Sequence, residues 1–100
     1  MNLRMMQKKI LQNKIDKGFN TTDVNMEFCL LYGEVAEAYN AWVYKKEDLG
    51  EELADAAIYL MGIAEILGFD LEEEIKKKVE KNRNRNYQYV NGILTEIPKK

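Results

Sequence analysis

Two stretches of the chain carry apolar residues at alternating steps of four and three, the spacing of one face of an α-helix. In the first stretch these residues are Val24, Phe28, Leu31, Val35, Ala38 and Trp42. In the second they are Leu49, Leu53, Ala56, Leu60, Ile63 and Leu67. A short polar turn at residues 45–50 joins the two, which favours antiparallel helices lying side by side. The pattern predicts a helical hairpin with both apolar stripes in its buried seam.

The flanking sequence predicts two further helices and a β-hairpin. Gly18 and Gly68 are helix stops, and Asp23, Asp48 and Asp70 are candidate N-caps. Asn91-Gly92 favours a type I′ turn. The expected elements are helices at about 3–17, 23–44, 48–67 and 70–86, and a hairpin at 87–97. We therefore predict an all-α fold, a single domain over residues 1–100 built as an oligomeric four-helix bundle with a short C-terminal hairpin.

Composition excludes several classes of function. A formal charge of −2 gives no general attraction to nucleic acid or to an anionic membrane. The chain has no histidine, so zinc sites and Ser-His triads are not expected. Its one cysteine, Cys29, allows no internal disulfide, and no apolar run is long enough to span a bilayer. We expect a soluble cytoplasmic protein that binds neither nucleic acid nor membrane.

Two acidic pairs lie beside the two predicted stripes. Glu34 and Glu37 are three residues apart, and so are Glu52 and Asp55. Residues at that spacing share a helix face, so two packed helices can bring four carboxylates together. Like charges repel there unless a cation lies among them, and oxygen ligands suit Mg²⁺ or Mn²⁺. The pairs predict a divalent metal site.

Acidic pairs at this spacing also occur by chance in a chain rich in acidic residues. The chain has 17 acidic residues in 100, so about three acidic pairs at this spacing are expected at random. Such pairs are usually solvated helix faces. Two observations favour the metal site: both pairs flank strong apolar stripes, and small alanine side chains surround them.

A basic cluster ends the last predicted helix. Its members are Lys78, Lys81, Asn82, Arg83 and Arg85. Cations at a helix C-terminus interact favourably with the helix dipole and stabilise the helix by about 0.3–1 kcal/mol. This effect alone can account for the cluster without any role in binding. Beside a carboxylate site the same residues suit a phosphate clamp, because Arg85 can grip phosphate oxygens bidentately and Lys78 can act as a point charge.

Aromatic residues offer a weaker signal. Trp42, Tyr39 and Tyr44 can stack on a base, although a core position is the better interpretation of Trp42. Phe19 and Tyr59 are expected in the core. Asn13 and Lys17 can reach a ligand from the first helix, but a solvated face is the expectation for both.

Three segments of the chain resemble the MazG-like nucleoside triphosphate pyrophosphohydrolases. These are residues 27–38 (EFCLLYGEVAEA), 50–60 (GEELADAAIYL) and 78–85 (KVEKNRNR). The likeness runs from about Asn13 to Arg85. It implies an all-α bundle that forms a dimer or a dimer of dimers. It also implies Mg²⁺-dependent cleavage of a nucleotide between its α and β phosphates, giving a monophosphate and pyrophosphate.

The resemblance also assigns roles to residues of this chain. The implied metal ligands are Glu34, Glu37, Glu52 and Asp55. The implied phosphate-binding residues are Lys78, Asn82 and Arg85. Without histidine, a carboxylate must orient or deprotonate the attacking water, and we assign that role to Glu37.

Two other functions stay open at this point. The chain is alternatively a non-catalytic helical interaction module, in which the acids are surface charge. It is also consistent with a related phosphoribosyl-nucleotide pyrophosphohydrolase. Because a four-helix chain of this length leaves apolar edges exposed, we expect a homodimer whose active site is completed across the interface.

Overall fold

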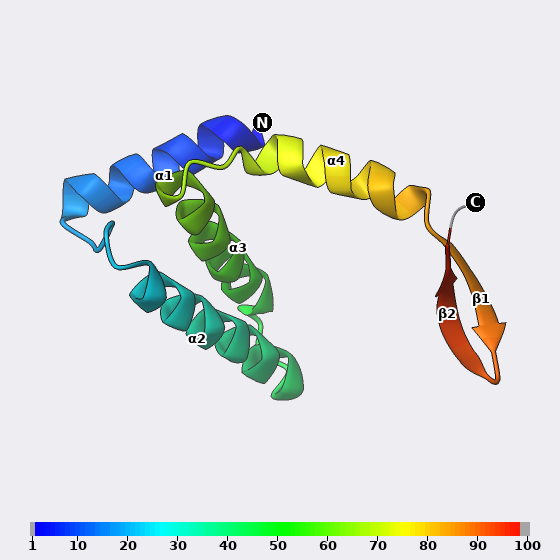
Figure 1. Cartoon of the computed structure of the whole chain (residues 1–100). Coiled ribbons are helices and arrows are strands. Elements are labelled where there is room, and N and C mark those ends of the chain that lie inside the picture. The colour runs from blue at the N-terminus through cyan, green and yellow to red at the C-terminus, as the bar shows by residue number, and fades with distance from the viewer. Residues whose placement is uncertain (1, 99–100) are drawn as a thin grey trace.

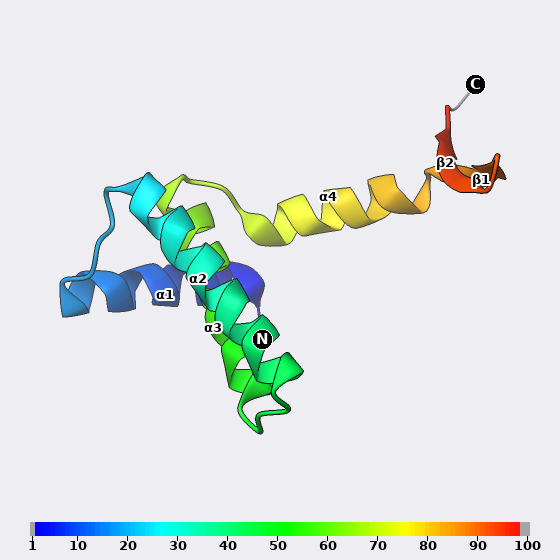
Figure 2. The same ribbon diagram turned by 90° about the horizontal axis from the view of Figure 1, so that it is seen from below.

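The computed structural model of the chain describes residues 2–98. Its elements are α1 (Leu3–Lys17), α2 (Val24–Val43), α3 (Leu49–Ile66), α4 (Leu71–Arg83), β1 (Asn86–Val90) and β2 (Ile93–Ile97). The predicted four helices and hairpin are thus confirmed. The helices α2 and α3 pack on each other along their length, and α1 crosses α3 (Figures 1 and 2). Helix α4 starts beside α1 and leads away from α2 and α3, carrying the hairpin at its far end (Figures 1 and 2).

Two of the three predicted aspartate caps form. The Asp23 carboxylate accepts a hydrogen bond from the Met26 amide at 3.1 Å, and that of Asp70 accepts one from the Glu73 amide at 3.3 Å. Asp48 precedes α3 but makes no such bond. Its backbone lies at φ −89° and ψ 14° rather than in the extended conformation that a capping side chain needs.

A buried glutamine joins α1, the end of α3 and the start of α4. The Gln7 amide donates to Glu65 Oε2 at 3.1 Å and to the Phe69 carbonyl at 2.9 Å. Its carbonyl oxygen accepts from the Leu71 amide at 2.8 Å. Gln7 is fully buried and satisfied at both ends of its amide group. This contact sets the direction in which α4 leaves the body of the molecule.

The predicted burial of the apolar stripes is correct for alternate stripe residues only: Ala38 and Ile63 are buried, Val24, Leu31, Leu49 and Ala56 are half-buried, and the other six are exposed. The buried residues of α2 are Glu27, Ala38 and Ala41. Along the α2 stripe the exposed side chains are Phe28, Val35 and Trp42, and along the α3 stripe they are Leu53, Leu60 and Leu67. Small alanines let the two backbones pack through the acidic face. Since α4 leads away, nothing in residues 2–98 covers these six exposed side chains.

The hairpin turns as its sequence predicts. Strands β1 and β2 are antiparallel, with Val90 opposite Ile93 across the turn. Asn91 and Gly92 have φ values of 53° and 77°, as a type I′ turn requires. None of the described helices is both long and apolar enough to cross a lipid bilayer.

Candidate metal centre

Three of the four predicted ligands converge where α2 and α3 pack. Glu34 and Glu37 come from α2, and Glu52 comes from α3. Each offers one carboxylate oxygen, and these oxygens all lie within 4.8 Å of one another. Glu34 and Glu52 are half-buried, whereas Glu37 is exposed. We call these three residues the carboxylate cluster.

The surroundings of the cluster disfavour its negative charge. Burial raises the pKa of Glu34 above the ordinary glutamate value, and the charges of Glu37 and Asp55 raise it further. Burial also raises the pKa of Glu52, with Glu37, Asp48 and Asp55 adding to the effect. Since protons and cations relieve the same repulsion, the cluster is a place where a positive charge is favoured.

The donor set fits a hard divalent cation. Oε2 of Glu34 and Oε2 of Glu52 are shielded from solvent and accept no hydrogen bond. Within residues 2–98, no lysine or arginine forms an ion pair with the three carboxylates. Buried carboxylate oxygens are normally paired or coordinate a metal. The cluster can therefore hold a divalent metal through oxygen ligands alone.

Asp55, the fourth predicted ligand, lies outside this set. Its side chain is exposed, and it is not among the residues whose oxygens come within 4.8 Å of one another. Its charge nevertheless acts on Glu34 and Glu52. A role for Asp55 as a ligand stays a prediction.

A cavity of about 230 Å³ opens beside the carboxylate cluster. Glu37 and Glu52 form part of its wall, together with Asn40 and Lys46. Lys45 adopts a left-handed conformation with φ 52°, which ends α2, and the Lys46 amide then donates to the Ala41 carbonyl at 2.8 Å. The sequence interpretation missed Asn40 and Lys46. The signal for Lys46 was a basic residue in the short turn between the two acidic pairs.

The sequence that forms this site matches the model of a known protein family. The model of the MazG-like family matches residues 25–93, more than half of the chain. The chain belongs to the MazG-like family. The match contains the carboxylate cluster, Asp55 and α4, and it starts after α1. No curated protein and no solved structure gives a significant match.

The predicted phosphate-binding residues of this MazG-like chain lie far from its carboxylates. Lys78 and Asn82 are exposed on α4, and Arg85 follows its end. Arg85 Nε lies 3.6 Å from Glu96 Oε2 on β2. Because α4 leads away from α2 and α3 (Figure 1), one copy of the chain does not bring these residues to the cluster.

The candidate stacking residues of the MazG-like chain are mostly exposed. Trp42 is 64% exposed, so its expected core position was wrong. Its ring centroid lies 6.2 Å from that of Tyr39, and both rings lie on the outer side of α2. Phe19 was also expected in the core and is 55% exposed.

Proposed function

We propose that this chain is a Mg²⁺-dependent nucleotide pyrophosphohydrolase that converts a nucleoside triphosphate and water to a monophosphate and pyrophosphate. The observation that carries the proposal is the pair of unpartnered, shielded oxygens on Glu34 and Glu52 in a MazG-like seam. A purely structural ion pair would satisfy such oxygens with a lysine or arginine. A nucleotide site with a metal explains both the unpaired carboxylates and the cavity beside them.

The residues of the cluster differ in burial, and we assign them different roles on that basis. Glu34, Glu37 and Glu52 would hold the metal in the seam, with Asp55 as the fourth ligand. When bound, the metal neutralises phosphate oxygens and lowers the pKa of water. Glu37, the exposed carboxylate, takes the proton of the water that attacks the α phosphorus. Full turnover by Glu37→Gln would exclude this role.

Cations of the chain offset the charge of the leaving pyrophosphate. Lys46 borders the cavity beside the cluster and acts within one copy. Lys78, Asn82 and Arg85 reach a cluster only in a second copy, because α4 leads away from its own seam. The exposed apolar stripes of α2 and α3 supply the surface for that second copy. The proposed enzyme is therefore a homodimer, and a monomeric mass in sedimentation at micromolar concentration would contradict this assembly.

Pyrophosphate release tests the function directly. Purified chain with Mg²⁺ is supplied with ribo- and deoxynucleoside triphosphates and with a phosphoribosyl-nucleotide. We expect Mg²⁺-dependent release that Glu52→Gln abolishes. Glu51→Gln is the matched control, since Glu51 is an exposed neighbour outside the cluster, and it should retain release. No release from any substrate, together with no change in melting temperature on adding Mg²⁺, would favour a non-catalytic interaction module.

A further inference from the structure

The β-hairpin stands apart from the helical body and is exposed almost throughout. It is a two-stranded sheet at the far end of α4 (Figures 1 and 2). All its strand residues are exposed except Ile97, which is half-buried. A hairpin of only two strands is marginally stable in water, yet this one is regular over five residue pairs. A further contact on this sheet is therefore expected.

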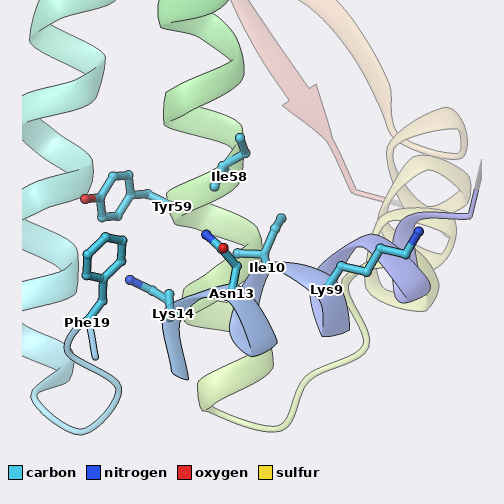
Figure 3. Close-up of a pocket in the computed structure, with 7 residues that line it drawn as sticks. All are labelled: Lys9, Ile10, Asn13, Lys14, Phe19, Ile58 and Tyr59. Atoms are coloured by element: carbon cyan, nitrogen blue, oxygen red, sulfur yellow. The ribbon is translucent and has the colours of Figure 1, made fainter. Parts of the chain in front are cut away.

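The crossing of α1 and α3, by contrast, satisfies its own charges. Figure 3 shows Lys14 there beside the rings of Phe19 and Tyr59. The Lys14 ammonium lies 5.2 Å from the centre of the Tyr59 ring and pairs with the buried Glu27 carboxylate. In residues 2–98 the hairpin has no third strand, so the backbone groups on its two outer edges lack such partners.

The turn determines which backbone groups of the hairpin point outward. In a two-residue type I′ hairpin, the residues that flank the turn exchange both of their hydrogen bonds. Here these residues are Val90 and Ile93. The direction of hydrogen bonding alternates along an antiparallel strand. The N–H and C=O groups of Tyr87 and Tyr89 therefore point away from β2, along the free edge of β1.

The two free edges of the hairpin differ in their protection. Natural proteins guard an edge strand against further pairing with charged side chains or with proline. The strand β2 carries the charged Glu96, and Pro98 follows its end. The strand β1 has the sequence NYQYV, with neither a charge nor a proline. The edge of β1 is therefore the one that is open to another strand.

The free edge of β1 is complementary to itself. About a two-fold axis at Gln88, two antiparallel copies of β1 bring Tyr87 of each copy opposite Tyr89 of the other. Both tyrosines have outward backbone groups, so each of the two tyrosine pairs can exchange two hydrogen bonds. Their side chains share one face of the sheet, where cross-strand aromatic pairs are stabilising. Tyr89 is 75% exposed within one copy, so its ring is free for such a pair.

The charges near β1 do not oppose this arrangement. The strand itself is uncharged, and the nearest cation is Arg85, three residues from the axis. The Arg85 residues of the two copies lie on opposite sides of the axis, about 20 Å apart at about 3.4 Å per strand residue. This separation exceeds the Debye length of about 8 Å at physiological ionic strength.

The area of the edge contact indicates that it works together with another interface. Four tyrosine side chains bury about 1,000 Å² at most, at up to about 250 Å² each. Stable interfaces bury roughly 1,200–2,000 Å². The exposed apolar side chains of α2 and α3 offer the additional surface to a second copy.

We infer that β1 pairs with β1 of a second copy about a two-fold axis at Gln88, so that two hairpins form one four-stranded sheet with the order β2-β1-β1-β2. The inference does not depend on the proposed activity. Because Arg85 immediately precedes β1, the pairing also holds the end of α4 that carries Lys78, Asn82 and Arg85.

Amide hydrogen exchange of the full ¹⁵N-labelled chain tests the pairing. The Tyr87 and Tyr89 amides should be protected, whereas the Leu94 and Glu96 amides on the other edge should exchange fast. This contrast is expected whether the pairing lies within one dimer or joins two dimers. Fast exchange at both tyrosine amides would overturn the inference.

A mixture of ¹³C-labelled and unlabelled chains identifies the partner strand. Intermolecular nuclear Overhauser contacts should join Tyr87 of one copy to Tyr89 of another. Contacts from these rings to α2 or α3 of another copy would mean that the hairpin docks on helices, and would overturn the inference. The absence of intermolecular contacts to these rings would overturn it as well.

Tyr89→Pro and Leu94→Pro form a matched pair. Leu94 lies directly opposite Tyr89, and neither N–H is used between β1 and β2. Tyr89→Pro removes one intermolecular hydrogen bond from each copy, so it should lower the protection of the Tyr87 amide at least about tenfold. Leu94→Pro should retain that protection. Protection of Tyr87 that survives Tyr89→Pro would contradict the pairing.

Charge substitutions at Gln88 test the axis, and they keep the inference testable if the proline variants lose the hairpin. Gln88→Lys or Gln88→Glu alone places like charges opposite each other, so each should lower the protection of the Tyr87 amide by about twofold to fivefold. An equimolar mixture of the two variants should restore it. Thr95→Lys is the control, because Thr95 lies opposite Gln88 on β2 and outside the contact. A mixture that restores nothing would overturn the inference.

Discussion

Glu27 and Glu34 lie two turns apart on the same face of α2, and their surroundings differ sharply. Glu27 is almost fully buried, pairs with Lys14 and accepts a hydrogen bond from Asn20 at 3.1 Å. Glu34 is half-buried beside Glu37 and Glu52, and within residues 2–98 it forms no ion pair with a lysine or arginine. The chain thus neutralises one carboxylate of the seam itself and leaves the next for a cation from outside.

This difference separates a structural charge from a functional one. A satisfied buried ion pair is costly to break because the remaining charge has no partner. A cluster of like charges repels itself and lowers stability unless a proton or a cation lies among the charges. Substitutions at the two positions should therefore change stability in opposite directions.

The largest change in stability is expected when the Lys14–Glu27 ion pair is broken. Lys14→Ala should destabilise the chain by about 3–5 kcal/mol, because it leaves the buried Glu27 carboxylate unpaired. Urea unfolding measures the change. Lys17→Ala, an exposed lysine of the same helix, is the control and should change stability by no more than about 0.5 kcal/mol. Equal effects of the two substitutions would mean that the ion pair has no structural importance.

The second prediction concerns Mg²⁺ and the carboxylate cluster. Mg²⁺ at about 100 times its dissociation constant should stabilise the wild-type chain by about 2.7 kcal/mol. Thermal melting at matched ionic strength with Na⁺ measures this effect. Glu52→Gln should abolish the response, since it removes a ligand, whereas Glu51→Gln should keep it. A response of the same size in both variants would place the metal elsewhere.

A smaller effect, of opposite sign to that of Lys14→Ala, is expected at the cluster. Without metal, Glu34→Gln should raise the melting temperature, because it removes one of the repelling half-buried charges. Glu47→Gln, an exposed glutamate of the α2–α3 turn, is the comparison and should change little. A lower melting temperature of Glu34→Gln would show that the cluster is satisfied without metal.

The smallest effect is a dependence on pH. The pKa values of Glu34 and Glu52 are raised in the folded chain, so the folded state binds protons more readily than the unfolded state. Their contribution to stability is therefore present at low pH and is lost as pH rises through the raised pKa values. Without metal, the difference in melting temperature between the wild type and the double variant Glu34→Gln, Glu52→Gln should become smaller as the pH falls through the raised pKa values. A gap that widens would contradict these pKa directions.

Local sequence signals predicted much of this fold. Apolar spacing, glycine stops and aspartate caps gave the helices, and Asn91-Gly92 gave the hairpin turn, because each signal acts within a few residues. The spacing of three also predicted that Glu34 and Glu37 meet Glu52. These features depend on backbone geometry that a short stretch of sequence determines.

The burial of particular faces could not be predicted in the same way. An apolar stripe indicates that a face will be covered, but not which element covers it, so Trp42 was misassigned to the core. The Lys14–Glu27 pair joins residues 13 positions apart through the crossing of α1. Lys46 reaches the cluster cavity only because α2 ends in a left-handed turn at Lys45. Each of these features depends on tertiary packing.

Binding of Mn²⁺ to the metal-free chain tests the central claim most directly. Electron paramagnetic resonance of Mn²⁺ distinguishes the free from the bound ion, and the titration needs no substrate. The account predicts saturable binding to wild type and to Glu51→Gln, with loss of binding in both Glu34→Gln and Glu52→Gln. Binding that survives in Glu34→Gln and Glu52→Gln, or no binding to the wild type, would contradict a metal site at the carboxylate cluster.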